Sequence, residues 1–492
     1  MHYQLLPLLS ILILMFHAFT LPLYKRKKMV YRNNLIVAAM VFIMSAVSLY
    51  FVAQNGSYVF DIGHYYQPIG IAFRIGSIEA LIAVLFSFVY GSIIWHSTTN
   101  LAHEISESKI STYYTLSTLL LASLLGIVYT YDIFTGFVFL EVNTLASCGL
   151  IAIKDTKESI KATLKYMILS SLSSGLVLLG IAFLYAITGH LSIPFIHEQL
   201  VIQASSHQNL VLISIILFTF GVAIKAALFP LHVWLPDAYT SAPTTTSAIL
   251  SSIVNKAPIF FLIKIFYMVY GFKIIQASHI LPVLLTMGAI AMIMGSLFAR
   301  TQKELKRMIA YSSVAQMGYI FLGIGLGNAL GLTMAIYQIF AHSLTKSTLF
   351  LTVGAIIEKT GFKTIEDIKG IGKKMPITLA IFTLCGLSMV GIPVLPGFIN
   401  KWNLAIASIQ MGKLGLLIII LASSLLNATY YFPIIINGYF GESKLDATVF
   451  DTKSKNVREL APLFVLAFAI FIVGLFSGTL IELIQKDFFT LK

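Results

Sequence analysis

The sequence predicts an all-α integral membrane protein with about fourteen transmembrane helices. Three observations lead to this fold class. Of the 492 residues, 58% are hydrophobic and only 11% are charged, a balance far outside the range of a soluble domain. The mean hydropathy is +0.89. The apolar residues also fall into runs of about twenty, long enough for an α-helix to cross a bilayer, and short basic loops separate the runs.

The apolar runs define the helices in chain order. We expect spans at 2–23, 31–53, 75–95, 112–130, 132–153, 162–187, 209–230, 246–270, 279–299, 309–327, 331–357, 376–410, 412–437 and 462–484. They divide the chain into an N-terminal part of three helices (1–111), two units of five helices (112–270 and 279–437) and a loop followed by the last helix (438–492).

Proline interrupts two of these spans. The seventh is expected to break at Pro230 and the twelfth at Pro393 and Pro396, because proline has no backbone N–H. A lysine stands beside each break, Lys225 in the first and Lys401 in the second. The paired breaks predict that the five-helix units are related, and the odd number of helices makes the second unit inverted. Membrane helices often carry proline, so chance coincidence is the alternative.

The basic residues predict the orientation of the chain in the membrane. Most of the 33 Lys and Arg fall in loops that the predicted helices place on one side. These clusters are Lys25–Arg32, Lys154–Lys161, Arg300–Arg307, Lys359–Lys374 and Lys444–Arg458. Positive-inside sorting puts them in the cytoplasm and both termini on the other side, which suits a multi-pass protein of the cell membrane. No basic tail is present, so a nucleic-acid partner is not expected.

The two cysteines do not indicate a redox or metal site. Cys148 and Cys385 both lie in apolar runs, without the spacing of a zinc or iron–sulfur site or of a disulfide framework. We therefore expect no cofactor and no metal in this chain, and we do not expect the chain itself to be a redox catalyst.

Ionisable residues stand in a row inside the predicted spans. They are Glu141, Lys225, Lys256, His342, Lys346 and Lys401. A charge at the bilayer centre costs roughly 2.5–3.5 kcal/mol even on the most lenient scale, so these side chains should face protein or water. Glu141 and Lys225 are expected to form a buried ion pair. The alternatives are snorkelling or structural pairing for the lysines, and a helix–helix hydrogen bond for His342.

Three further ionisable residues lie nearer the ends of the spans. For Lys264 we expect snorkelling to the membrane surface, and Lys165 is expected at the interface. The role of Glu79, early in the third helix, is ambiguous from the sequence.

The row is suited to moving protons. Desolvation makes a lysine release its proton more easily, whereas a nearby carboxylate makes it hold the proton. Side chains on adjacent helices are further apart than one hydrogen bond, so transfer between them would need bridging waters. We expect the row to run parallel to the membrane plane.

The residues around this row resemble the antiporter-like subunits shared by respiratory complex I, Mrp-type cation/proton antiporters and membrane-bound hydrogenases. The resemblance rests on FVFLE at Glu141, GVAIKAALFPLHVWLPDAYTSAPTTTSA at Lys225, LKRMIAYSSVAQMGY, HSLTKSTLF at Lys346 and GIPVLPGFINKW at Lys401. It covers helices 4 to 13. The FVFLE form and the chain length look most like the D-type Mrp antiporter subunits and the hydrogenase branch.

The resemblance implies a fold of fourteen helices with an inverted repeat of helices 4–8 and 9–13. It also implies that the row occupies the proton-path positions of the family. Two residues depart from the family pattern. Tyr239 stands where many relatives have His, and Pro258 follows Lys256 where a helix-compatible residue is usual. Both departures leave the water route near the eighth helix in question.

The function expected from these features is that of an ion-translocating subunit, which pumps protons or exchanges them for Na⁺. Its partners would be other membrane subunits, which would supply the redox chemistry of an oxidoreductase or complete an antiporter. The alternative is a self-contained secondary transporter for a solute. Such a carrier needs polar groups that grip its solute, whereas the broken helices here offer mainly lysines. A scaffold without transport gains nothing from buried lysines.

Overall fold

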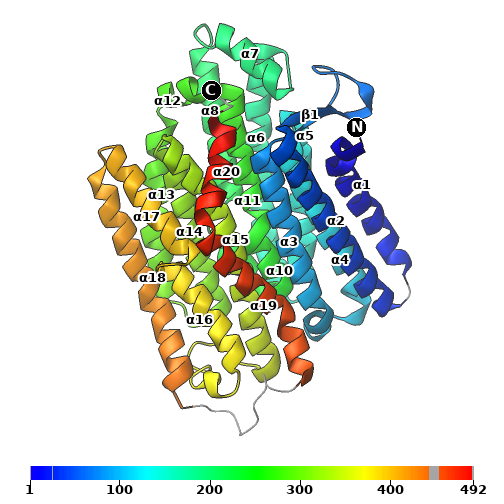
Figure 1. Ribbon diagram of the computed structural model, residues 1–492, viewed down its shortest axis with the longest axis vertical. Coiled ribbons are helices and arrows are strands. Elements are labelled where there is room, and N and C mark those ends of the chain that lie inside the picture. Colours follow the sequence, from blue (N-terminus) through cyan, green and yellow to red (C-terminus); the bar gives the residue numbers. More distant parts are fainter. Residues whose placement is uncertain (1, 25, 443–453, 490–492) are drawn as a thin grey trace.

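The computed structural model describes residues 2–24, 26–442 and 454–489 as a bundle of long helices with a small two-stranded sheet at one end (Figure 1). Lys25 and most of the predicted cluster Lys444–Arg458 lie outside the described residues.

The helices begin and end as follows: α1 (Leu6–Thr20), α2 (Lys27–Asn55), α3 (Ser77–Asn100), α4 (Ile110–Tyr129), α5 (Ile133–Ala152), α6 (Lys157–Thr188), α7 (Ile193–Gln203), α8 (Gln208–Lys225), α9 (Leu235–Ser241), α10 (Thr244–Ile249), α11 (Lys256–Lys264), α12 (Phe272–Ala277), α13 (Ile280–Arg300), α14 (Leu305–Gly325), α15 (Ala329–Thr360), α16 (Pro376–Val390), α17 (Pro396–Gln410), α18 (Leu414–Phe440), α19 (Ser454–Leu475) and α20 (Ser477–Phe489). Two π-helices, η6 (Leu250–Val254) and η7 (Ile265–Tyr270), flank α11. Short 3₁₀ turns lie at His2–Leu5, Leu21–Leu23, Ile62–His64, Leu101–His103, Glu107–Lys109 and Ile371–Lys373.

The strands β1 (Tyr58–Asp61) and β2 (Ala72–Ile75) pair antiparallel, with Tyr58 opposite Ile75 and Asp61 opposite Ala72. They form a hairpin between α2 and α3. The strand β2 is buried along its whole length, and it leads directly into α3.

The predicted membrane spans agree with the helices. In the described part of the chain, twelve helices are long and apolar enough to cross a membrane, and α19 and α20, which meet at 72°, pass the same test together as a bent pair. The predicted run 376–410 coincides with α16 and α17 together. The protein is therefore a multi-pass membrane protein.

The centre of the bundle is formed by α15, α14 and the continuous segment from α10 to η7. Every residue in the most apolar part of α15 and of Thr244–Tyr270 is buried, whereas α1, α2, α6 and α18 present apolar side chains outward. This exposed apolar surface is what a lipid-facing helix requires.

Small residues bring α13 and α14 into close backbone contact. A side chain on Gly288 would lie 2.6 Å from the backbone nitrogen of Leu322, and one on Gly295 would lie 2.5 Å from that of Ala315. Only glycine fits at such distances, as in other membrane helix pairs. The pairing fixes α14, which contributes residues to the candidate site.

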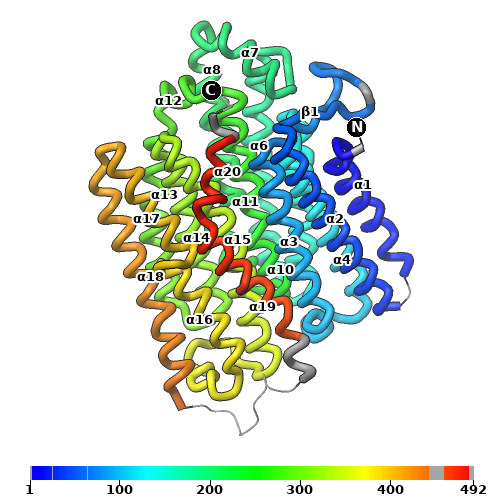
Figure 2. Tube along the Cα trace, in the orientation of Figure 1, coloured from blue at the N-terminus to red at the C-terminus, as the bar shows by residue number. Residues whose placement is uncertain are grey.

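The basic clusters and the chain termini lie at opposite ends of the bundle. The start of α1 and the end of α20 lie at the same end, and the tube in Figure 2 makes this clear. The predicted basic clusters Arg300–Arg307 and Lys359–Lys374 are joined by backbone hydrogen bonds, from Leu305 N–H to Lys363 O at 3.0 Å and from Ile365 N–H to Lys303 O at 2.9 Å. They lie at the opposite end from the termini (Figure 1).

Candidate functional site

The first broken helix ends earlier than the sequence predicted. We expected the break at Pro230, but α8 ends at Lys225. Ala227 then adopts a positive φ of 55°, which no continuing right-handed helix permits. The reason is steric, because the ring of a proline excludes the helical carbonyl four residues before it. The non-helical segment therefore starts directly after Lys225.

Lys225 and Glu141 form the predicted ion pair. The Nζ atom of Lys225 lies 3.4 Å from Oε1 of Glu141 and donates a hydrogen bond of 2.7 Å to Thr144. The hydroxyl of Ser174 on α6 donates to the same Glu141 oxygen. The lysine side chain is 6% exposed, but that of Glu141 is 33% exposed. The expectation that both partners are buried therefore fails for the carboxylate, which lies at the surface of the bundle.

Lys256 is entirely buried at the start of α11. Its ammonium donates to the backbone carbonyl of Ser251 in the preceding π-helix. Pro258, which the sequence marked as unusual, is the third residue of α11, four residues after that π-helix ends at Val254. A proline in the first turn of a helix lacks only an N–H that has no helical acceptor, so it is tolerated there.

Tyr239, the second unusual residue, links α9 to the π-helix. Its hydroxyl donates to Leu250 O at 3.0 Å and accepts a hydrogen bond of 2.9 Å from the Asn255 side chain. Asn255 directly precedes Lys256 in the chain. Tyr239 therefore helps to fix the backbone from which Lys256 extends.

His342 and Lys346 are both fully buried on α15, four residues apart. Lys346 donates to Ile309 O at 3.0 Å and to the hydroxyl of Ser312, both on α14. In the described residues, neither ring nitrogen of His342 has a hydrogen-bond partner. The adjacent Ser343 donates to Ser252 O at 2.5 Å, which joins α15 to the π-helix before Lys256.

Lys401 binds the carbonyls that the second break leaves free. Its ammonium donates to Met389 O and Val390 O, each at 2.8 Å, at the end of α16. Gly391 follows with a φ of 96°, which ends that helix. Pro396 begins α17, where its missing N–H is not needed, and Pro393 lies in the turn between the helices.

The elements that carry the row meet in turn: α5 and α8 at the Glu141–Lys225 pair, α8 with α11, the π-helix before α11 with α15, and α15 with α17. Of the predicted lysines in the row, only Lys225 has a carboxylate within ion-pair distance among the described residues. The other three are held by uncharged groups: carbonyls and a hydroxyl and, for Lys401, also the ring of Tyr319, whose centroid lies 5.3 Å from its ammonium. Such a site stabilises an ammonium less than a carboxylate does.

Sequence reasoning missed a chain of polar groups between Lys346 and Lys401. Ser312, which accepts from Lys346, lies 3.0 Å from the hydroxyl of Tyr431 on α18. The ring of Tyr430 packs beside that of Tyr431, with centroids 4.8 Å apart, and its hydroxyl donates to Asn427 at 2.6 Å. The Asn427 amide donates to Met389 O at 3.2 Å, the same carbonyl that Lys401 binds.

The sequence only weakly indicates these polar residues. Polar residues in the tenth and thirteenth spans, YSS and NATYY, are the only hint of them. Neutral polar residues are common in membrane helices, and only the packing of α14 against α18 could select these from the others.

The expectation that Lys264 snorkels is wrong. The side chain is 2% exposed and lies 3.7 Å from the equally buried Glu79, which also pairs with Arg74 at 2.8 Å. Its ammonium donates to Val128 O at 3.0 Å and Thr130 O at 2.6 Å. The helix that carries it is surrounded by protein, so no path to the membrane surface exists for the side chain.

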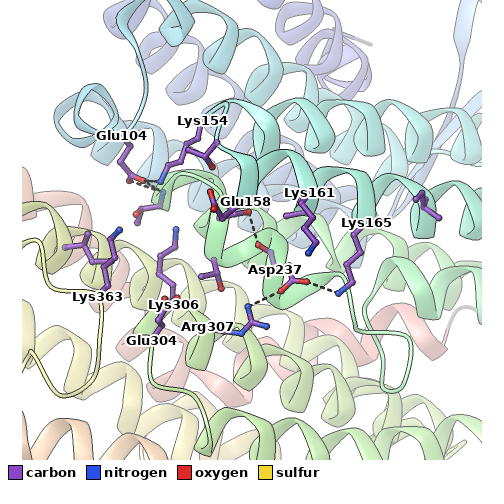
Figure 3. A pocket seen from close by; sticks show the side chains of 17 residues that line it. Glu104, Lys154, Glu158, Lys161, Lys165, Asp237, Glu304, Lys306, Arg307 and Lys363 are labelled. Carbon is purple, nitrogen blue, oxygen red and sulfur yellow. Dashed lines mark hydrogen bonds and ion pairs between the residues drawn. The ribbon is translucent and has the colours of Figure 1, made fainter.

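A charged pocket of about 980 Å³ opens at the end of the bundle where the basic clusters lie (Figure 3). Glu104 lies in it, paired with Lys154 at 2.6 Å, and its two carboxylate oxygens share the N–H of Thr244, which lies 3.0 and 3.1 Å away. Burial raises the pKa of the Glu104 carboxyl, but the charges of Lys306 and Lys154 outweigh burial and hold this pKa below its usual value. Thr244 begins α10, the helix that leads to Lys256.

No group of three or more His, Cys, Asp or Glu that could hold a metal ion occurs in the part of the chain that the structure describes.

Comparison with known proteins gives consistent matches. Residues 130–427 match the family described as NADH:quinone oxidoreductase/Mrp antiporter, transmembrane region. The chain is 32% identical to NADH-quinone oxidoreductase subunit N of Desulforudis audaxviator, with 97% of each chain covered. It is 30% identical to the D-type subunit of the Na(+)/H(+) antiporter of Alkalihalophilus pseudofirmus, covering 82% of this chain and 80% of that one.

Two solved structures are also similar. A chain of the membrane-bound sulfane sulfur reductase, an archaeal respiratory membrane complex, has a TM-score of 0.89 and 28% identity, with 98% of this chain and 96% of that chain covered. A chain of the Mrp complex from Dietzia sp. DQ12-45-1b has a TM-score of 0.88 at 23% identity, over 99% and 96% of the two chains, and this match concerns the fold.

Proposed function

Because the chain belongs to the NADH:quinone oxidoreductase/Mrp antiporter family and is an ion-translocating membrane subunit of a multisubunit assembly, we propose that the ion it moves is the proton. The carriers are Glu141, Lys225, Lys256, His342, Lys346 and Lys401. The observation that supports this most strongly is the state of the last three lysines. They are buried and lack an ion-pair partner among the described residues.

An ammonium buried without a counter-ion is costly, and loss of its proton removes that cost. Lysine can release a proton, whereas an arginine at the same place could not. A Na⁺ site would instead need several oxygen ligands around one point, and the amines of this row supply none. Protons are therefore the ion that suits these side chains.

The charged pocket is the proposed entrance of the proton. From Thr244 at its wall, α10 and η6 lead to Lys256 through buried hydroxyl residues, namely Thr244, Thr245, Thr246, Ser247, Ser251 and Ser252. Hydroxyl groups can both donate and accept hydrogen bonds, so they can support a chain of waters. From Lys256 the proposed route continues past His342 to Lys346, and then along Ser312 and Tyr431 towards Lys401.

We propose that the pocket faces the cytoplasm and that the chain lies in the cell membrane, with redox or antiport partners in other subunits and no cofactor of its own. The basic clusters around the pocket support this orientation. Glu141 supports the placement of a neighbouring subunit. A carboxylate that is one third exposed on a lipid-facing helix is costly in hydrocarbon, and another protein chain can cover it.

The experiment compares two lysine variants of the whole complex in proteoliposomes. Lys256→Ala removes a proposed carrier, and Lys273→Ala removes an exposed lysine of α12 as a control. Proton flux should fail in Lys256→Ala with normal subunit assembly and stay normal in Lys273→Ala. Flux should not depend on external Na⁺. Normal flux in an assembled Lys256→Ala complex would exclude the route, and transport of Na⁺ without protons would exclude the proposed ion.

A further inference from the structure

One side of the charged pocket brings together three cations from two helices that are far apart in sequence. Lys165 on α6 donates to Asp237 at 2.8 Å, and Arg307 on α14 donates to the other oxygen of Asp237 at 3.0 Å. Lys161 lies one turn before Lys165 and lines the same pocket. Figure 3 shows these side chains around Asp237. The carboxylate thus holds two cations in place while most of their donors stay free.

The positive charges of this corner outnumber its negative charges by one. Lys161 has no ion-pair partner among the residues that the structure describes, and its side chain is exposed. Asp237 and Glu158, which also lines the pocket, compensate two of the three positive charges. The corner therefore carries a net charge of one, and it suits a ligand with a single negative charge.

The corner lies where the membrane surface is expected to be. The helix α6 has 32 residues and is therefore about 48 Å long, so it extends beyond a hydrocarbon core of about 30 Å by roughly 9 Å at each end. Lys165 is eight residues from the start of α6, or about 12 Å along it. Leu164, directly before it, is 51% exposed and Ile168, one turn after it, is 64% exposed, so an apolar surface lies at the same depth.

We propose that this corner binds the phosphodiester headgroup of an anionic membrane phospholipid, with Lys161, Lys165 and Arg307 around the phosphate and the acyl chains along Leu164 and Ile168. A phosphodiester carries the single negative charge that the corner lacks. Arginine and lysine are the usual donors to phosphate, and basic pockets between helices on the inner side of membranes bind such headgroups. The apolar surface below the corner favours a lipid over free phosphate.

The test measures lipid binding to the purified complex by native mass spectrometry after delipidation. Phosphatidylglycerol is titrated, with phosphatidylcholine as the neutral lipid. Lys161→Gln and Arg307→Gln should each weaken the tightest phosphatidylglycerol site about fivefold, the change that corresponds to about 1 kcal/mol per basic residue. Arg307→Lys should retain the site. Lys157→Gln, which removes an exposed lysine of the same helix outside the pocket, is the matched control.

Three outcomes would overturn the proposal. One is unchanged phosphatidylglycerol binding in Lys161→Gln and Arg307→Gln, with the fold of each variant checked by thermal unfolding. The second is equal weakening by Lys157→Gln, which would show general surface attraction. The third is complete displacement of the lipid by inorganic phosphate, which would assign the corner to a soluble anion. Because lipid binding is measured without ion flux, the result does not depend on the proposed proton route.

Discussion

Replacing Lys401 by methionine separates a proton carrier from a structural side chain. Methionine is similar in length and apolar, and it removes the ammonium from the carbonyls of Met389 and Val390. A structural role predicts that the protein becomes less stable, because a charged anchor between α16 and α17 is lost. A carrier role predicts that stability is kept and transport is lost.

The structure allows the stability change to be worked out. The carbonyl of Met389 keeps the hydrogen bond from Asn427 at 3.2 Å, so the variant leaves only the carbonyl of Val390 without its partner. One unsatisfied buried carbonyl costs about 1–3 kcal/mol. Removal of a buried ammonium without a counter-ion relieves a desolvation penalty of several kcal/mol. The free energy of unfolding should therefore not fall in Lys401→Met.

Two assays on the same preparation decide between the roles. Thermal unfolding of the detergent-solubilised complex should show an unchanged or higher midpoint, and proton flux in proteoliposomes should fall at least about tenfold, which is a barrier increase of about 1.4 kcal/mol. Lys401→Arg should lose flux as well, because arginine keeps the charge but does not release its proton. Lys413→Met, in the turn before α18, is the control. Full flux in Lys401→Met, or a clear drop in its midpoint, would refute the reasoning.

Three further predictions concern other parts of the chain. Tyr431→Phe should reduce proton flux, because it interrupts the polar chain after Ser312. The control Tyr270→Phe deletes a similarly buried hydroxyl, which is hydrogen-bonded to Ser214 at 2.6 Å, and it should leave flux intact. Equal effects of the two variants would exclude a specific role for Tyr431. A cysteine at Lys303 should be labelled only from the cytoplasm and one at Ser206 only from outside, and the reverse pattern would invert the proposed orientation. The lowered pKa of Glu104 predicts a stability that depends on pH. The ionised carboxylate stabilises the folded protein in full above pH 4.5, the ordinary pKa of a glutamate, and this stabilisation is lost as the pH falls through the lower pKa of the folded state. Wild-type protein should thus unfold at a higher temperature than Glu104→Gln at neutral pH, and the difference should shrink in acid; a constant difference would contradict this.

The sequence was sufficient to predict the helices and one ion pair. Twenty-residue apolar runs have few alternatives to membrane helices, and the cost of an isolated charge requires Glu141 and Lys225 to find partners. The same reasoning failed for Lys264. Its distance from the end of a span suggested snorkelling, but burial of the whole helix is a property of the packed bundle, and Arg74 and Glu79 approach it from segments nearly two hundred residues away.

The sequence also did not predict where the helix breaks would begin or which neutral polar side chains would contact one another. Pro230 shows that a helix must end, but the residue at which it ends depends on the left-handed backbone of Ala227, which sequence patterns do not mark. Ser312 and Tyr431 are neutral, so their burial has a low cost and leaves no clear pattern. Their role follows only from the contact between α14 and α18.

The row is unequal along its length, and this inequality indicates where a neighbouring subunit can act on it. Among the lysines of the row, Lys225 alone has a carboxylate within ion-pair distance in the described residues, whereas Lys256 and Lys401 have only uncharged partners. On the proposed route, a proton would therefore be held most firmly at Lys225. If the proposed route operates, removing the negative charge of Glu141 would weaken proton binding at Lys225 and favour transfer of the proton to Lys256. Glu141 is also the member of the row with a third of its side chain exposed. On the proposed route, a charged group of an adjoining subunit placed against Glu141 would therefore shift the protonation of the row from outside the bundle.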